Sequence, residues 1–187
     1  MNKYAKYFAI HGTDKMLHGY HKHYEKVVGD SKIDRILEIG TRSGNSLMAW
    51  SDIWPDAIIE SMDLLDPPEN VSDKFKIHVA SSRDCEYSSI VMTDEYDMII
   101  DDGGHHWKDQ LATFYNFYEK SNRFYVIEDI RGGYCLGRLI RELPMDVLTK
   151  ISIFHSELDL GKINFTFSEN KETQTCHFIM FIDKHKN

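Results

Sequence analysis

The sequence of 187 residues has few cysteines and no long apolar run. Its three cysteines, Cys85, Cys135 and Cys176, lie far apart and form no C-x-x-C pair. This argues against a zinc ribbon or a disulfide scaffold and favours reduced thiols. No stretch approaches the about 18 apolar residues of a membrane span, and the N-terminus lacks the apolar segment of a signal peptide. We therefore expect a cytoplasmic protein without a membrane partner.

Basic residues are scarce relative to acidic ones, 22 against 30, so the formal net charge is -8. Because phosphate neutralisation supplies most of the affinity for nucleic acids, an acidic chain without a basic run is a poor nucleic-acid binder. The sequence has no repeat and no linker, since Pro67-Pro68 is typical of a turn. With 42% hydrophobic residues it predicts a single domain over 1–187, in which an N-terminal segment (1–30) precedes the core (31–187).

The most informative stretch is 35–46. A short apolar run rich in β-branched residues leads into a loop with Gly40 and Gly44, and an apolar periodic segment follows. This order of strand, glycine loop and helix binds nucleotides at the carboxyl end of a parallel strand, although an ordinary strand-to-helix turn has the same pattern. Gly40 permits a sharp turn, and Gly44 would let a ligand lie near the start of the helix. The dinucleotide fingerprint is excluded, because Arg42 and Asn45 stand where it requires glycine.

The pattern Glu38-x-Gly40-x-x-x-Gly44 resembles the first motif of class I S-adenosylmethionine-dependent methyltransferases. The resemblance implies that Glu38 helps to place the methionine part of the cofactor. Thr41 and Ser46, in the same loop, are assigned to the cofactor site with the two glycines.

A second strand is expected over 57–64, and Asp63 lies near its end, 23 positions after Gly40. An acid at this point commonly accepts hydrogen bonds from both ribose hydroxyls of an adenosine ligand. Asp66 competes for that role, and a solvated acid before a turn is the alternative.

A third strand is expected over 76–80. In the methyltransferases that the chain resembles, the following loop packs against the adenine edge, which implies cofactor contacts from Ser82 and Asp84. Asp84 could equally be the N-cap of a helix that continues through Ile90.

Two further strands end in clusters of polar residues. The strand core 98–100 is followed by Asp101, Asp102, Gly103, Gly104, His105 and His106, and the strand 124–127 is followed by Glu128 and Asp129. Such side chains are costly to bury without partners, and they converge if the two strands are parallel neighbours. Hard oxygen ligands suit Mg²⁺, Mn²⁺ or Ca²⁺ better than zinc, while solvated acids at the rim of the sheet are the alternative.

These two clusters resemble the Asp-Asp-Gly-Ser-His and Val-Val-Glu-Asp motifs of metal-dependent class I O-methyltransferases, which include macrolide-sugar and cephalosporin-pathway methyltransferase-like proteins. The resemblance covers about residues 11–130, with Gly104 in place of the usual serine and without the large extensions of the antibiotic-sugar enzymes. It implies that Asp102, Glu128 and Asp129 hold a divalent metal, Mg²⁺ by preference. It also implies that His105 is the general base, with Asp102 at the catalytic centre and Asp101 in the cofactor site.

Near the N-terminus a helix is expected from Leu17 to Val28, with Thr13 or Asp14 as its N-cap. Tyr20 and Tyr24 lie on one face, which either faces the core or covers the cofactor end of the sheet. The segment resembles the lead-in of some small methyltransferases, and this implies that Tyr20 contacts the cofactor.

The remaining segments complete an α/β pattern. Helices are expected over 107–120 and 135–143, and strands over 150–155, 163–167 and 177–182, the last two forming an antiparallel hairpin. The prediction is a Rossmann-like fold with a seven-stranded, mostly parallel sheet and helices on both faces.

The leading hypothesis is an S-adenosylmethionine-dependent, divalent-metal-assisted O-methyltransferase that acts on a small hydroxylated acceptor such as a sugar. A metal-dependent hydrolase built on His105, His106 and the acids is one alternative. A cofactor-binding module without an acceptor site is another. The sequence leaves the acceptor, the metal and a homo-oligomeric state open.

Overall fold

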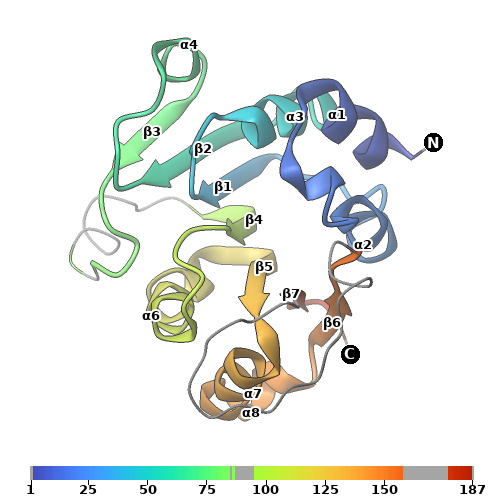
Figure 1. The fold of residues 1–187 in the computed structure, drawn as a ribbon, viewed down its shortest axis with the longest axis vertical. Coiled ribbons are helices and arrows are strands. Elements are labelled where there is room, and N and C mark those ends of the chain that lie inside the picture. The colour runs from blue at the N-terminus through green and yellow to red at the C-terminus, as the bar shows by residue number, and fades with distance from the viewer. Residues whose placement is uncertain (1, 85, 87–94, 158–176, 187) are drawn as a thin grey trace.

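The computed structural model describes residues 2–84, 86, 95–157 and 177–186. In this part of the chain seven strands form one sheet in the order β3-β2-β1-β4-β5-β7-β6 (Figure 1). The strands are β1 (Arg35–Ile39), β2 (Ile58–Asp63), β3 (Lys76–Val79), β4 (Tyr96–Asp101), β5 (Ser121–Arg131), β6 (Ile151–His155) and β7 (His177–Asp183). β1 to β5 run parallel to one another, and β7 pairs antiparallel with both β5 and β6. The predicted seven-stranded, mostly parallel sheet is therefore confirmed.

The chain reverses its direction of progress through the sheet between β1 and β4, which are neighbours although β2 and β3 lie between them in sequence. Ligands of open α/β sheets bind outside the carboxyl ends of the strands at such a switch point. The antiparallel hairpin expected between 163–167 and 177–182 is not tested, because 163–167 lies outside the described residues; β7 pairs instead with β6, the strand expected over 150–155.

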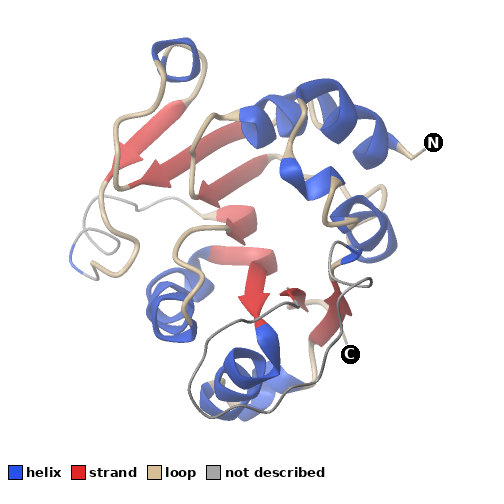
Figure 2. Cartoon of the chain, viewed as in Figure 1, coloured by secondary structure: helices blue, strands red, loops and turns tan. Residues whose placement is uncertain are grey.

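Helices cover both faces of the sheet (Figure 2). One face packs against α1 (Lys3–His11), α2 (Tyr20–Val27) and α3 (Asn45–Ile53), and the other against α6 (Trp107–Phe117), α7 (Gly132–Glu142) and α8 (Met145–Leu148). The short elements are η1 (Asp14–Met16), α4 (Glu69–Ser72) and η2 (Tyr118–Lys120). Each helix within the described residues is too short or too polar to cross a membrane.

The N-terminal segment differs from the single helix expected over 17–28. Gly19 adopts a left-handed conformation, with φ 72°, and α2 begins only after it. Thr13 caps η1 instead, because its side chain accepts from the backbone N–H of Lys15. Tyr20 and Tyr24 are buried in the same core cluster as α1 and the sheet, so this face of α2 faces the core.

Gly40 brings the loop after β1 against the backbone that follows β4. Its φ is 100°, and a Cβ atom there would lie 2.3 Å from the carbonyl oxygen of Asp102. Both the conformation and the contact exclude a side chain. The glycine therefore sets the spacing between the two loops that end β1 and β4.

We expect Gly40→Ala to lower the free energy of unfolding by about 2 kcal/mol or more, since overpacking adds to backbone strain. Gly137→Ala, in α7, is the matched control: its Cβ would meet no atom within 4 Å, and φ there is not positive. Alanine in a helix interior should raise stability by about 0.5–1 kcal/mol. Urea unfolding measures both effects, and equal effects of the two substitutions would contradict this assignment.

Candidate functional site

A cavity of about 820 Å³ lies at the carboxyl ends of β1, β2 and β4. Its walls come from residues 12–14, 39–43, 45–46, 62–64, 80–83 and 102–105, together with Asp109 and Asp129. Ligand pockets commonly enclose about 300–1,000 Å³, so a nucleoside-sized molecule fits here. The predicted cofactor residues that line the cavity are Gly40, Thr41, Ser46, Asp63 and Ser82.

Asp63 ends β2 in the wall of this cavity. Its Oδ2 accepts from the backbone N–H groups of Thr41 at 2.7 Å and Arg42 at 3.1 Å, and its Oδ1 accepts from Leu65. Burial opposes its ionisation, but the backbone donors outweigh burial and hold its pKa below the usual value. Asp63 is thus a fixed, ionised acceptor at the cavity. The alternative, Asp66, is exposed and outside the lining.

Glu38 lies behind the cavity wall rather than in it. Its side chain is fully buried, and Oε2 accepts from the Ser46 hydroxyl at 2.7 Å and the Trp50 indole N–H at 3.1 Å. Thr41 makes a similar buried contact, between its hydroxyl and that of Ser61 at 2.7 Å. Glu38 is therefore linked to the cavity lining through Ser46, which does line it.

Gly44 is a glycine for a different reason from the one expected. Its φ is 73°, and a Cβ atom would lie 2.5 Å from Cγ2 of Val71. Gly44 is absent from the cavity lining, whereas its neighbours Ser43 and Asn45 belong to it. The missing side chain accommodates a packed valine, so the prediction that Gly44 makes room for a ligand is replaced by a packing role.

Ser82 and Asp84, in the loop after β3, differ in their surroundings. Both were predicted to contact the cofactor, with helix capping as the alternative for Asp84. Ser82 lines the cavity, and its hydroxyl is 2.7 Å from that of Thr113. Asp84 is exposed and outside the lining, and its carboxylate accepts from the backbone N–H of Glu86 at 3.0 Å. This contact favours the N-cap alternative for Asp84. The helix expected through Ile90 lies outside the described residues.

Asp101 and Asp102 point to different surroundings at the end of β4. Asp101 is buried outside the cavity lining and accepts from the backbone N–H of Gly103 at 3.3 Å. Burial raises the pKa of Asp101 well above its usual range. Asp102 lines the cavity. Of the two acids, Asp102 is thus the one placed to meet a ligand.

Lys15 is the residue that the sequence pattern did not reveal. Its side chain is buried, and its ammonium lies 2.7 Å from Asp102, 3.1 Å from Glu38 and in short contact with Glu128. Burial works against the charged form, but the three carboxylates outweigh it and raise the pKa of Lys15. Burial, together with the charge of Asp102, also raises the pKa of Glu128 and of Glu38, although Lys15 opposes the shift. Buried carboxylates need a positively charged partner, so the expected acid cluster was the signal in the sequence that could have indicated a buried lysine or arginine.

Glu128 and Asp129 both meet α2, although consecutive residues of a strand normally face opposite sides. Glu128 accepts from the Tyr24 hydroxyl at 2.5 Å, and Asp129 accepts from the Tyr20 hydroxyl at 2.6 Å. The cause is a break in β5: Asp129 has φ 50°, and the register with β7 shifts between Ile127 and Ile130. An irregularity of this kind redirects a side chain.

The expected metal trio of Asp102, Glu128 and Asp129 does not come together among the described residues. One oxygen of Glu128 contacts Lys15 and the other accepts from Tyr24, so Glu128 is engaged within the protein. Asp102 and Asp129 do lie together, with His105 as the third member of the group. The cation in contact with Glu128 is thus Lys15, which lies 113 positions away in the sequence.

His105 lies close to Asp102 and Asp129. Its Nε2 is 4.0 Å from Oδ2 of Asp129, and it lines the cavity. Burial lowers its pKa despite the nearby carboxylates, which favours the neutral imidazole. His106 instead caps α6, where its Nδ1 accepts from the backbone N–H of Lys108 at 3.3 Å.

Tyr20, which the resemblance assigns to the cofactor site, lies outside the lining of the cavity. Its ring is buried, and its hydroxyl donates to Asp129. Burial, followed by the charges of Asp129 and Glu128, raises its pKa far above the usual range. Tyr20 therefore orients Asp129 from behind the cavity.

No protein-family model and no curated protein matches the chain. Among solved structures, it is similar to the MycE methyltransferase from the mycinamycin biosynthetic pathway in complex with Mg, SAH and mycinamycin VI, with 24% identity and a TM-score of 0.62. The match covers 68% of this chain and 39% of that one, so the chain spans less than half of that relative. The plantazolicin methyltransferase BpumL in complex with SAH matches at 12% identity and a TM-score of 0.57 over 97% of this chain and 88% of that one.

A human methyltransferase 10 domain containing protein matches with 14% identity and a TM-score of 0.56, over 89% of this chain and 81% of that one. At these identities the similarity shows the fold. The chain therefore has the Rossmann-like fold of S-adenosylmethionine-dependent methyltransferases.

Proposed function

We propose that the chain is an S-adenosylmethionine-dependent O-methyltransferase that acts on a small hydroxylated acceptor such as a sugar. The observation that carries the proposal is that one cavity contains both a candidate cofactor acceptor and a separate group of acids with a histidine. Asp63 stands in one wall, and Asp102, His105 and Asp129 stand in the other, all at the carboxyl ends of the strands. The similar structures that contain SAH and Mg support the same assignment.

Asp63 and the loop after β1 would hold the adenosine part of the cofactor. The carboxylate is fixed by the backbone N–H groups of Thr41 and Arg42 and still presents lone pairs to ribose hydroxyls. Ser82, in the next wall, offers a hydroxyl toward the same space. S-adenosylmethionine supplies a methyl group on a positively charged sulfur, which an oxygen nucleophile can take.

His105 would remove the proton from the acceptor hydroxyl. Its lowered pKa keeps the imidazole neutral near pH 7, so it can accept that proton, and Asp102 and Asp129 stabilise the imidazolium that results. Lys15 holds Asp102 in place at 2.7 Å, and Tyr20 holds Asp129. The chain thus contributes positioning and charge stabilisation.

The proposal includes a divalent metal, but with two carboxylate ligands from the chain instead of the three that the resemblance implies. Mg²⁺ is usually bound by one or two carboxylates with water and substrate completing the shell. Asp102 and Asp129, which face the cavity, fit that description, and Glu128 does not. A bound Mg²⁺ would lower the pKa of the acceptor hydroxyl.

Calorimetric titration with S-adenosylhomocysteine tests the proposal. We expect saturable binding, and we expect Asp63→Ala to weaken it by at least about tenfold, because two hydrogen bonds to a charged acceptor are lost. Asp66→Ala is the matched control, since Asp66 is exposed and outside the cavity lining. Binding of a metal ion without S-adenosylhomocysteine would favour the hydrolase instead. Cofactor binding without transfer to any hydroxylated acceptor would leave a binding module.

A further inference from the structure

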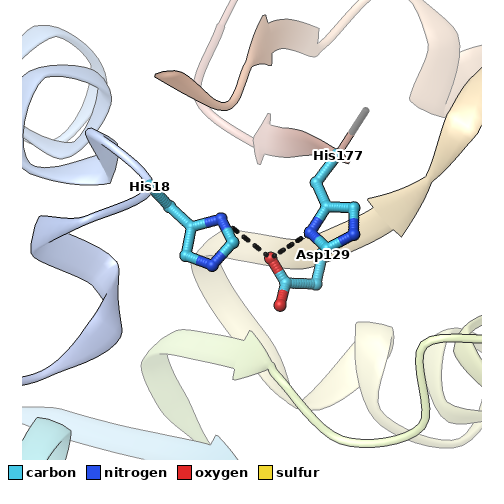
Figure 3. Close-up of side chains that lie close together, drawn as sticks. All are labelled: His18, Asp129 and His177. Carbon is cyan, nitrogen blue, oxygen red and sulfur yellow. Dashed lines mark ion pairs between the residues drawn. The ribbon is translucent and has the colours of Figure 1, made fainter. Parts of the chain in front are cut away.

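Two imidazoles converge on one oxygen of Asp129, on the side away from His105. Nδ1 of His18 is 3.7 Å and Nδ1 of His177 is 3.5 Å from Oδ1 (Figure 3). His105 instead lies nearer the other oxygen, Oδ2. His18 precedes α2, Asp129 lies in β5 and His177 begins β7, so three separate elements bring the group together. Neither His18 nor His177 lines the cavity.

We propose that His18, Asp129 and His177 form a site for a transition-metal ion, Zn²⁺ or an ion of similar preference. Each residue offers one ligand atom, and these atoms lie within 4.8 Å of one another. Tetrahedral zinc with bonds of about 2.0–2.1 Å places neighbouring ligand atoms about 3.3–3.4 Å apart. The two separations from Asp129 are within a few tenths of an ångström of that spacing.

The ligand set selects the ion. Imidazole nitrogen suits zinc, copper, iron and nickel, whereas magnesium prefers oxygen and water. Two imidazoles and one carboxylate are also a ligand set of zinc enzymes that keep a fourth position for water or substrate. The site therefore differs in chemistry from the pair Asp102 and Asp129 that faces the cavity, although Asp129 belongs to both.

The surroundings hold these side chains in the arrangement. The rings of His18 and His177 are stacked, with centroids 5.5 Å apart and an interplanar angle of 9°. Tyr20 donates to Oδ1 of Asp129 at 2.6 Å and so orients the carboxylate, as outer partners of metal ligands do. Nδ1 of His18 also lies 2.9 Å from the hydroxyl of Ser156, a contact that the ion would replace.

The backbone gives an independent indication. Asp129 is one of two described non-glycine residues with positive φ, at 50°, and it sits where β5 loses register with β7. Such a conformation costs of order 1 kcal/mol and is found at functional sites, where surrounding contacts maintain it. Here it turns the carboxylate toward His18 and His177, away from the direction that a regular strand would give.

Metal titration of the chelator-treated chain tests this proposal without any assay of activity. Co²⁺ is the probe, because its visible absorption reports ligand number and type, and Zn²⁺ should then displace it. We expect one tightly bound ion, and we expect His18→Gln and His177→Gln each to weaken binding by at least tenfold. His11→Gln is the control, since His11 forms a histidine–carboxylate pair with Asp52 at 2.8 Å on the surface.

Thermal unfolding adds a readout that does not depend on a variant's affinity alone. Zn²⁺ should raise the Tm of the unaltered chain and of His11→Gln equally, and it should raise the Tm of His177→Gln less at the same Zn²⁺ concentration. Absence of binding, or unchanged binding in both His18→Gln and His177→Gln, overturns the proposal. Loss of binding in His105→Gln but not in His177→Gln moves the ion into the cavity and overturns it equally. S-adenosylhomocysteine binding is measured separately, so failure here is distinct from failure of the proposed methyl transfer.

Discussion

Replacing Lys15 by methionine should cause a larger loss of stability than Gly40→Ala. The ammonium lies between Asp102, Glu38 and Glu128, and the last two acids are fully or almost fully buried. Removing one partner of a buried ion pair costs about 3–5 kcal/mol, because the remaining charge is left uncompensated. A domain is stabilised by about 5–15 kcal/mol in total, so Lys15→Met should remove a large share of the stability of the fold. Urea unfolding at low temperature measures the loss.

Two controls separate charge burial from the general effect of losing a lysine. Lys22 pairs with Glu157 at 2.5 Å on the surface, and Lys22→Met should cost less than about 1 kcal/mol. Glu128→Gln removes one of the acids that Lys15 neutralises, and in the double variant it should restore part of the stability lost in Lys15→Met. A loss below about 1 kcal/mol in Lys15→Met, or no recovery in the double variant, would show that the acids do not depend on this cation.

The sequence predicted those parts of the site that depend on local order along the chain. Gly40 follows a strand directly, and Asp63 ends the next one, so the parallel arrangement brings both to the same edge of the sheet. Asp102 and His105 follow β4 in the same way. For these residues the strand pattern fixes the position, and only the direction of the side chain stays open.

The periodic pattern of the sequence could not predict contacts between segments that are distant along the chain. Lys15 is 87 positions from Asp102 and 113 from Glu128, and no periodicity relates them. The sequence places Tyr20 at a cofactor, but its hydroxyl reaches Asp129, 109 positions away. The positive φ of Asp129 decides this outcome, and nothing in the run Glu128-Asp129 indicates a break in the strand.

The same break determines the surroundings of the two acids that the resemblance assigns to a metal. A regular strand would turn Glu128 and Asp129 to opposite faces of the sheet. The resemblance nevertheless implied one common oxygen site for these two acids and Asp102. In the structure α2 approaches both acids, with Tyr24 on Glu128 and Tyr20 on Asp129. Lys15 neutralises the buried Glu128. The half-buried Asp129 instead lies near three imidazoles, those of His18, His105 and His177.

His105→Ala should produce the largest loss of activity. General acid–base catalysis contributes about 10²–10⁴-fold to a rate, and among the described residues His105 is the imidazole that lines the cavity. We therefore expect kcat for methyl transfer to fall by about 10²–10⁴-fold. The affinity for S-adenosylhomocysteine should change less than about twofold, because His105 follows β4, whereas the proposed ribose acceptor Asp63 ends β2. Single-turnover transfer from labelled S-adenosylmethionine and calorimetry measure the two quantities.

His106→Ala is the matched control, since it removes the neighbouring imidazole, whose role is to cap α6. Loss of a cap costs about 0.5–2 kcal/mol of stability and should leave kcat within about twofold. A pH profile of kcat/KM tests the role of His105 as a base. Its acid limb should report a group with a pKa below the usual histidine value, because burial lowers the pKa of His105. That limb should be absent in His105→Ala. Full activity in His105→Ala, or an equal loss in His106→Ala, would remove His105 from the reaction, while the buried carboxylates around Lys15 would keep their structural role.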